Sequence, residues 1–484
     1  MRKNYSPFHI ILFITICLSI LGGISLLVPS GKLKIAGYDF RFISQNKLHK
    51  IDTRKKVDLK DIVVDIDTTI IDNTDSIDTT IKVLNFNINV SQHLEYNNTA
   101  KETFKTFFTQ LHLANSKKVR ILHYGDSQIE GDRFTSFLRQ RLQEQFGGNG
   151  PGFIPAVNTI NSMSFTQTYS PNFIRYTNYG GGALKQSSNY GILNTVGRFT
   201  PEDTIKSVVK NDSIKSLPPT KAWVEIIPGK VAFGRAKVFT NIYIHYTDAY
   251  TKCLVKVFVN GENIRNDSLI SDGKYHIYTL NLATTPENVR FEFEAVTSPT
   301  FLGYSLEGGN GILVDNIAMR GSSGTFFGKI NQGLAKRIYD DQNVDLFIMQ
   351  FGGNSVPYIK DSTDAANMAS FFKGQLQVIK RLRPNAAIIV IGPSDMSTLV
   401  EGEYTTYPIL PYYIECMKKR TKEVGGAYFD LYEAMGGKDA MVAWVENDLA
   451  ANDYIHFSVK GAKIAAQKFY DAFMAAYTKI MNDK

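Results

Sequence analysis

The chain is poor in cysteine and tryptophan: its 484 residues include only 3 cysteines and 2 tryptophans. Cys17 lies in an apolar run, which leaves Cys253 and Cys416 as a possible pair, and the sequence leaves open whether they form a disulfide. No group of Cys and His residues has the spacing of a zinc site, so we expect neither a structural metal nor a bound cofactor. A chain of this length can bury a core large enough to fold without disulfides.

The body of the chain also lacks an excess of charge of either sign. The formal net charge of +8 arises within residues 1–60, which hold 11 Lys and Arg against 3 Asp and Glu. The other 424 residues hold 43 of each sign. Binding to a phosphate backbone needs a concentration of Lys and Arg. The composition therefore excludes nucleic acid as the expected partner.

One long apolar run is present, from Phe8 to Val28, with no charge unless His9 is protonated. Its 21 residues are enough to cross a hydrocarbon core of about 30 Å, and no small-residue cleavage site follows it. We expect an uncleaved signal anchor with an N-terminal transmembrane helix in residues 1–30, followed by a linker, 31–95. A cleaved signal peptide is the alternative. Lys and Arg after the run outnumber those before it, which argues against translocation, although large domains often cross regardless of flanking charge.

Beyond residue 95 the pattern is that of an α/β domain. Apolar residues at helical spacing predict a helix over 95–115. A short apolar strand over 119–124 stops in a Gly-Asp-Ser turn, and a second amphipathic helix is predicted over 133–146. Strand, tight turn and helix form the opening unit of an α/β sheet.

The pattern changes between the two halves of this domain. From 196 to 304 apolar residues alternate in short segments, and Asn260-Gly261 is a strong hairpin signal. Several short strands separated by turns predict a β-sandwich. After Gly311 strands and helices alternate again. We therefore expect one α/β domain, formed by 96–195 and 305–484, into which a β-sandwich is inserted.

Three residues of this α/β domain suggest nucleophilic catalysis. Ser127 ends the first strand of the expected open sheet, where ligand sites fall. A serine hydroxyl needs a base to attack an ester, and the base needs an orienting carboxylate. Asp453 and His456 provide that pair three residues apart, just before the last helix. The carboxylate can reach Nδ1 of the imidazole and leave Nε2 for the serine.

Two further residues are candidates for stabilising the negative charge that such an attack creates. Asn354 ends a Gly-Gly-Asn turn after a predicted strand, and Gly321 lies in a Gly-rich turn after another. Together with the Ser127 N–H they would form an oxyanion hole. Each motif alone is common in ordinary loops. Their order, each at a strand end or before a helix, favours a catalytic site.

The order Ser, Gly, Asn, Asp-x-x-His resembles the SGNH (GDSL-type) hydrolases, a family of serine esterases. The four matching blocks are GDSQ at 125–128, Gly321, GGN at 352–354 and DYIH at 453–456. The family more often has leucine where this chain has Gln128. The resemblance implies a flavodoxin-like α/β/α sandwich, an SGNH hydrolase fold. It also implies roles for five residues: Ser127 as nucleophile, His456 as base, Asp453 as its orienter, and Gly321 and Asn354 in the oxyanion hole.

Within this family the chain is similar to peptidoglycan O-acetylesterases, through the β insertion, GGNGPGF at 147–153 and MGGKDAMVAW at 435–444. The resemblance implies an esterase that removes O-acetyl groups from a cell-envelope glycan, with peptidoglycan preferred and the insertion similar to a carbohydrate-binding module. Such a substrate places the body in the bacterial periplasm or at the extracytoplasmic face, anchored in the membrane. An O-acetyltransferase would use the same residues, and a catalytically retired glycan-binding scaffold is a third reading.

Aromatic residues in the insertion are candidates for stacking on sugar rings, although alternating strand aromatics more often pack in a core. They are Trp223, Tyr243, Tyr246 and Tyr250. Tyr243 and Tyr246 lie three residues apart and so on opposite faces of a strand, and we expect one buried and one exposed. His123, inside the first strand, is expected to be a packed core residue rather than a second base.

Overall fold

The computed structural model describes most of the chain after residue 92 and parts of the N-terminal region. The described residues are 7–27, 32–35, 38–41, 93–180, 189–201 and 218–483. The chain forms two compact units, Met1–Lys56 and Val57–Lys484. All three cysteines are free, so Cys253 and Cys416 do not pair.

The first unit contains helix α1 (Pro7–Leu27) and an antiparallel pair, β1 (Lys32–Ile35) and β2 (Tyr38–Arg41). Helix α1 coincides with the apolar run predicted to cross a membrane. Among the described residues, however, no helix is both long and apolar enough to do so. The predicted N-terminal transmembrane helix is therefore not supported. The predicted linker lies mostly within 42–92, outside the described residues.

The second unit is built on a sheet of five parallel strands. In spatial order they are β15 (Gly311–Ala318), β3 (Lys118–Gly125), β16 (Val344–Gln350), β17 (Ala387–Ile391) and β20 (Ala427–Phe429). Numbered along the chain, this order is 2-1-3-4-5, the flavodoxin-like arrangement. The predicted fold class of this domain is therefore confirmed.

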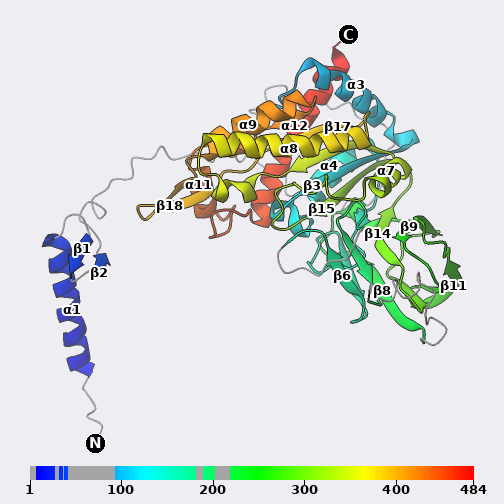
Figure 1. The fold of residues 1–484 in the computed structure, drawn as a ribbon, viewed down its shortest axis with the longest axis horizontal. Helices are drawn as coiled ribbons and strands as arrows, with labels where there is room; N and C mark the ends of the chain where they lie inside the picture. Colours follow the sequence, from blue (N-terminus) through cyan, green and yellow to red (C-terminus); the bar gives the residue numbers. More distant parts are fainter. Residues whose placement is uncertain are drawn as a thin grey trace, which may run out of the picture. The chain divides into compact units, whose positions relative to one another are not determined.

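Helices cover both faces of the parallel sheet (Figure 1). One layer contains α3 (Asn98–His112), α4 (Thr135–Phe146) and α12 (Val459–Asn482), and the other contains α7 (Gln332–Asp341), α8 (Ser362–Leu382) and α9 (Leu410–Glu423). Successive strand residues point to opposite faces, so Ile121 packs in the first layer and Leu122 in the second. Burial on both faces explains why strands such as β17 are apolar throughout.

The insertion is a sandwich of two antiparallel sheets, ordered β11-β10-β13-β8-β5 and β12-β9-β14-β7-β6, with β4 beside β14. Its strands are β4 (Gly152–Ile154), β5 (Phe165–Tyr169), β6 (Ile174–Thr177), β7 (Thr195–Arg198), β8 (Thr220–Pro228), β9 (Asn241–Thr247), β10 (Cys253–Val259), β11 (Glu262–Leu269), β12 (His276–Asn281), β13 (Val289–Ala295) and β14 (Thr300–Glu307). Asn260 and Gly261, with φ of 52° and 86°, turn the β10–β11 hairpin as predicted.

The sandwich begins earlier than residue 196, where the alternation becomes visible in the sequence. Strands β4, β5 and β6 already belong to it and start at Gly152. They are three to five residues long, so each shows little alternation by itself. Their pairing partners β14, β8 and β7 come later in the chain and begin at Thr300, Thr220 and Thr195.

A buried ion network joins the sandwich to the parallel sheet. Arg120 on β3 binds Asp315 on β15 at 2.8 Å and also binds Glu307 on β14. The Asp315 carboxylate also accepts the Phe153 N–H from β4 at 2.9 Å. Burial acts to raise the pKa of Glu307, but Arg120 and Lys118 outweigh it and lower the pKa to about 2. One network of buried charges thus holds strands of the parallel sheet (β3 and β15) to strands of the sandwich (β4 and β14).

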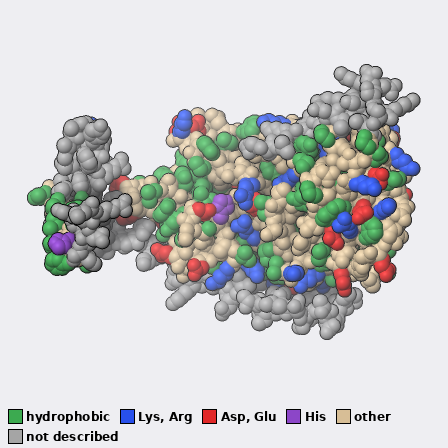
Figure 2. Space-filling model, turned by 90° about the horizontal axis from the view of Figure 1, so that it is seen from below, with side chains coloured by type: hydrophobic (Ala, Val, Ile, Leu, Met, Phe, Trp, Pro, Cys, Tyr) green, Lys and Arg blue, Asp and Glu red, His purple; other side chains and the backbone are tan. Residues whose placement is uncertain are grey.

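Charge on the molecular surface is mixed in sign. Figure 2 shows Lys and Arg interspersed with Asp and Glu over the face in view. Among the described residues of this face, no continuous basic patch of the kind that a phosphate backbone requires is visible.

Candidate active site

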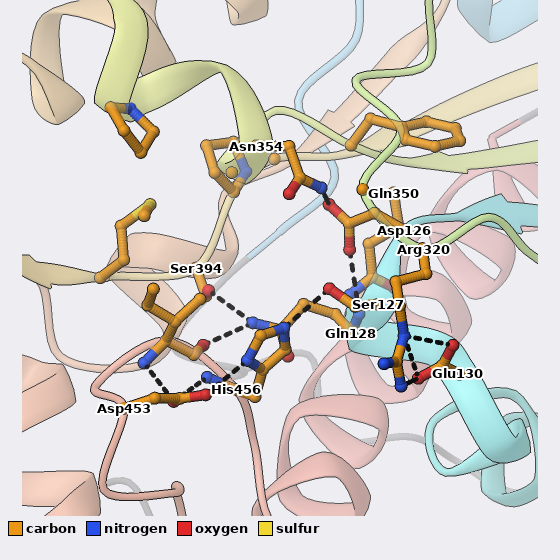
Figure 3. Close-up of a pocket in the computed structure, with 18 of the residues that line it drawn as sticks. Asp126, Ser127, Gln128, Glu130, Arg320, Gln350, Asn354, Ser394, Asp453 and His456 are labelled. Carbon is orange, nitrogen blue, oxygen red and sulfur yellow. Dashed lines mark hydrogen bonds and ion pairs between the residues drawn. The ribbon is translucent and has the colours of Figure 1, made fainter. Parts of the chain in front are cut away.

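A pocket of about 520 Å³ opens at the carboxyl ends of the parallel strands, where open α/β sheets bind ligands (Figure 3). Four of the five strand ends contribute to it: Ser127 follows β3, Gly321 follows β15, Asn354 follows β16 and Ser394 follows β17. His456 reaches the pocket from the loop before α12. The fold therefore brings together residues separated by up to 329 positions.

Ser127, His456 and Asp453 form one chain of hydrogen bonds, as the sequence predicts. Ser127 Oγ lies 2.7 Å from His456 Nε2, and His456 Nδ1 lies 2.7 Å from Asp453 Oδ2. The second carboxylate oxygen of Asp453 accepts the backbone N–H groups of Ile455 and His456, at 2.9 and 3.0 Å. This turn fixes the carboxylate relative to the imidazole, which leaves Nε2 facing the hydroxyl.

The environment of Asp453 keeps its carboxylate ionised. Burial acts to raise its pKa, but the backbone N–H of His456, the imidazole itself and the Ile455 N–H outweigh burial, and the pKa is lowered. An ionised carboxylate beside Nδ1 stabilises the imidazolium that forms when His456 takes a proton. The arrangement is therefore suited to general-base catalysis.

Ser127 is the first residue of the 3-10 helix η3 (Ser127–Asp132). Its N–H has no acceptor within the helix, because the first residues of a helix lack intrahelical partners. The preceding residue, Asp126, accepts the Gln128 N–H at 2.9 Å and caps the turn. The turn thus places the hydroxyl and the free N–H of one residue at the same pocket.

Asn354 lies in the pocket, but both hydrogens of its amide are engaged. Its Nδ2 donates to Asp126 Oδ2 and to the Ser322 carbonyl, each at 3.1 Å. Burial raises the pKa of Asp126 to about 6, against the lowering effect of its bonds from Gln128 and Asn354 and of the nearby His456. To face an oxyanion, the amide has to release one of these acceptors.

Of the two glycines in the turn after β15, Gly321 is the one that lines the pocket. Its φ is 74°, and no atom lies within 4 Å of the position that a Cβ would occupy. Gly324, three residues later, is packed against Phe351 and donates its N–H to Ser322 Oγ at 3.1 Å. Of the two glycines, Gly321 therefore stays the candidate for an oxyanion donor.

Gln128 holds the residues on both sides of His456, a contact that the sequence did not predict. Its Nε2 donates to the Ile455 carbonyl at 2.6 Å and to Ser394 Oγ at 3.3 Å, and its Oε1 accepts the Phe457 N–H at 3.2 Å (Figure 3). A leucine at this position, the residue named above as more common in the hydrolases that the sequence resembles, could make none of these bonds. The only sequence signal was that departure.

A second group missed from the sequence borders the pocket. Glu130, buried on η3, forms a bidentate ion pair with the exposed Arg320. Arg133 donates to the carbonyls of Glu130 and Phe457, at 2.9 and 3.2 Å. Both arginines line the pocket together with the triad.

Of the four aromatic residues of the insertion that were candidates for stacking on sugar rings, three are buried or covered by a cationic side chain. Tyr246 is buried, and its hydroxyl accepts the Ile270 N–H at 3.0 Å. Tyr243, which lies on the opposite face of the strand, is half-buried rather than exposed, and the Lys118 ammonium lies 5.2 Å from its ring centre. Trp223 is covered by the Arg290 guanidinium at 4.1 Å, whereas Tyr250 is exposed.

His123 is a core residue, as predicted. Its ring nitrogens bond Gln350 at 3.0 Å and Thr135 at 2.9 Å, and burial lowers its pKa to about 3. Over the part of the chain that the structure describes, no group of three or more His, Cys, Asp or Glu residues could hold a metal ion.

The fold and the site define an α/β protein of flavodoxin-like topology that carries a Ser-His-Asp chain at its strand ends. A solved structure of a peptidoglycan O-acetylesterase is similar to it, with a TM-score of 0.60 and 18% identity over 80% of this chain and 99% of that one. The predicted resemblance is thereby confirmed as a likeness of fold.

Two further solved structures align with TM-scores below 0.5, so their overall likeness to this chain is weak. One is a family two carbohydrate esterase from Clostridium thermocellum in complex with cellohexaose, with a TM-score of 0.23 and 10% identity over 52% of this chain and 91% of that one. The other is a salicylyl-acyltransferase from a tetracycline biosynthetic pathway, with a TM-score of 0.26 and 12% identity over 66% of this chain and 100% of that one. No family model and no curated protein sequence matches the chain.

Proposed function

We propose that this protein is a serine esterase that removes O-acetyl groups from a cell-envelope polysaccharide, with peptidoglycan as its preferred substrate. The observation that carries the proposal is the hydrogen-bonded chain of Ser127, His456 and Asp453 at the pocket. A serine hydroxyl in such a chain is activated for attack on an acyl carbon.

In the first half of the reaction Ser127 Oγ attacks the acetyl carbonyl carbon while His456 Nε2 takes the hydroxyl proton. Asp453 stabilises the imidazolium through Nδ1. The tetrahedral intermediate then collapses, its bond to the sugar oxygen breaks, and His456 returns the proton to that oxygen. The products of this half-reaction are the free sugar hydroxyl and an acetyl-serine.

The oxyanion of the intermediate is stabilised by N–H donors at the same pocket. The Ser127 N–H and the Gly321 turn are the backbone candidates, and Asn354 joins them when one of its amide hydrogens leaves Asp126 or Ser322. Loss of one such donor costs about 3–4 kcal/mol of transition-state stabilisation in well-studied hydrolases.

Hydrolysis is favoured over transfer to another sugar because the triad is open to water. The side chains of His456 and Asp453 are 33% and 46% exposed. Water can therefore reach the acetyl-serine, with His456 again acting as base. A transferase has to exclude water from its acyl-enzyme, so an exposed triad argues against the O-acetyltransferase alternative.

Support for a glycan substrate comes from the fold shared with a peptidoglycan O-acetylesterase. A cell-envelope glycan lies outside the cytoplasm, so the proposal places the body of the protein there. A reporter that is active only in the periplasm, fused after Lys484, is expected to be active. An active cytoplasm-only reporter at the same position would contradict this location.

The function is tested by measuring acetate release from O-acetylated peptidoglycan by purified residues 93–483, compared with Ser127→Ala. We expect release by the unsubstituted protein and none by the variant. Release from an activated acetyl ester but not from the glycan would retain the esterase and reject the substrate. Transfer of the acetyl group to an added acceptor glycan, in place of release as acetate, would support the transferase alternative.

A further inference from the structure

A second hollow lies beside the catalytic pocket, between η3 and the first strands of the sandwich. Its volume is about 180 Å³, and it shares Glu130 and Arg320 with the catalytic pocket. Arg175 and Tyr179 of the sandwich line its far side. The two hollows are therefore contiguous, and the Glu130–Arg320 ion pair, shown at the edge of the catalytic pocket in Figure 3, borders both.

The second hollow carries one surplus positive charge. Its two carboxylates are each paired, Glu130 with Arg320 and Asp132 with Arg139. The remaining charged residue of its lining is Arg175. The catalytic pocket differs, because Asp126, Glu130 and Asp453 there face only Arg133 and Arg320. An anionic group is therefore better accommodated in the second hollow than beside the nucleophile.

Arg175, on β6, is held in place by uncharged partners. Its Nε donates to Thr195 Oγ1 at 2.9 Å, one terminal nitrogen to Thr159 Oγ1 at 2.7 Å and the other to the Tyr179 hydroxyl at 2.8 Å. A guanidinium has five N–H groups, so one remains on each terminal nitrogen. Two N–H groups on neighbouring nitrogens are what a carboxylate accepts side by side.

The shape of the surface suggests a long ligand rather than a small acid. A third hollow, of about 390 Å³, follows β5 and the loop before it, and shares Asn158 and Ser162 with the second. The three hollows thus form a continuous path from Ser127 onto the sandwich. A polymer chain can follow such a path, whereas a small ester can occupy only its first part.

We propose that the second hollow is a subsite for a carboxylate-bearing substituent of the acetylated glycan, bound by Arg175 while the acetyl ester lies at Ser127. This inference rests on the proposed function and adds a chemical selection to it: an acidic glycan is preferred over a neutral one. The carboxylate can come from an ether-linked lactyl group that carries no peptide or from a uronic acid, because both present a free carboxylate to the guanidinium.

The test compares Arg175→Gln with the unsubstituted protein on four acetylated substrates: a muramyl glycan, a uronate-bearing xylan, a neutral xylan and an activated acetyl ester. We expect kcat/KM for one or both acidic glycans to fall roughly tenfold to a hundredfold, with the neutral xylan and the small ester unchanged. The acidic substrate that loses rate identifies the source of the carboxylate. Arg290→Gln, on the opposite sheet and over Trp223, is the matched control and should alter none of the four.

Arg175→Lys should restore much of the preference, because it keeps the charge. Added salt should reduce the acidic-to-neutral rate ratio of the unsubstituted protein, a measurement that does not depend on the folding of any variant. Equal loss on acidic and neutral glycans, no loss on either acidic glycan, or a salt-independent ratio would overturn the subsite. Absence of turnover on every acetyl ester would instead refute the proposed function.

Discussion

Replacement of Gln128 by leucine tests whether this side chain positions the catalytic base. Gln128 is buried, with 9% of its surface exposed, and bonds the backbone on both sides of His456. Leucine is similar in size but leaves the Ile455 carbonyl and the Phe457 N–H without these partners. Each unsatisfied buried group costs about 1–3 kcal/mol, so we expect the loss of both partners to lower the free energy of unfolding by about 2–6 kcal/mol.

The Gln128→Leu substitution should lower kcat more than it changes KM. The loop that carries His456 loses two of its attachments, and a displacement of about 1 Å of a catalytic group can cost on the order of 10²-fold in rate. We expect kcat on an activated acetyl ester to fall by about that factor, with KM changed little, because the pocket wall that holds the ester is left in place. The assay is steady-state kinetics at a temperature where the variant is fully folded.

Gln140→Leu provides the matched control. Gln140 is equally buried, at 9% exposed, but its side chain bonds Glu144 and the Arg235 N–H, away from the pocket. This control should lose stability and keep kcat. Unchanged kcat in a folded Gln128→Leu protein, or an equal loss in both variants, would refute the positioning role.

Three further predictions concern the nucleophile, a buried carboxylate and the ion network. Ser127→Ala should reduce acetyl-ester hydrolysis by orders of magnitude and leave the circular dichroism spectrum unchanged; a preserved rate would contradict the mechanism. The pKa of Asp126 is raised from 3.8 to about 6 by burial, so its native form holds the proton more tightly than the unfolded chain. The unsubstituted protein should thus lose about 2 kcal/mol relative to Asp126→Asn as the pH rises from 4 to 6, and a stability difference between the two proteins in urea unfolding that stays constant across this range would disprove it. Arg120→Leu strands the carboxylates of Asp315 and Glu307 and should destabilise the protein by about 3–5 kcal/mol at neutral pH, less at low pH; a loss in urea unfolding that does not depend on pH would be the contrary result.

The alternation of strands and helices in the α/β domain could be predicted because its signal is local and strong, whereas the strand order was implied only by the resemblance to the SGNH hydrolases. Strands such as β17 are apolar at every position, and each ends at a turn that carries a recognisable motif. The sequence predicts that Ser127 and His456 lie together for a chemical reason, because a serine nucleophile requires a base. The structure places them 2.7 Å apart.

The parts that the sequence did not predict depend on contacts between distant segments. Strand β4 has three residues and exists because β14 pairs with it, so its membership in the sandwich has no local signal. Gln128 and Ile455 are 327 positions apart, and no periodicity relates them. The same holds for Glu130 and Arg320, whose pairing depends on the meeting of η3 with the turn after β15.

The engagement of Asn354 is a third feature that only the structure could show. The Gly-Gly-Asn turn suggested an amide free to bind an oxyanion, whereas both amide hydrogens are bonded within the protein. The two N–H groups of an asparagine amide can donate either to an oxyanion or to acceptors of the protein. Which of these they bond depends on the acceptors that the fold places beside the amide. Asp126 and Ser322 are those acceptors.

The central claim is that Ser127 becomes acetylated during turnover. The most direct measurement is mass spectrometry of the protein after acid quenching of a reaction with an activated acetyl ester, followed by peptide mapping. The account predicts one acetyl group on the peptide that contains Ser127, accumulating in a burst and absent from Ser127→Ala. Hydrolysis that persists in Ser127→Ala, or an acetyl group that accumulates on a different residue, would contradict it.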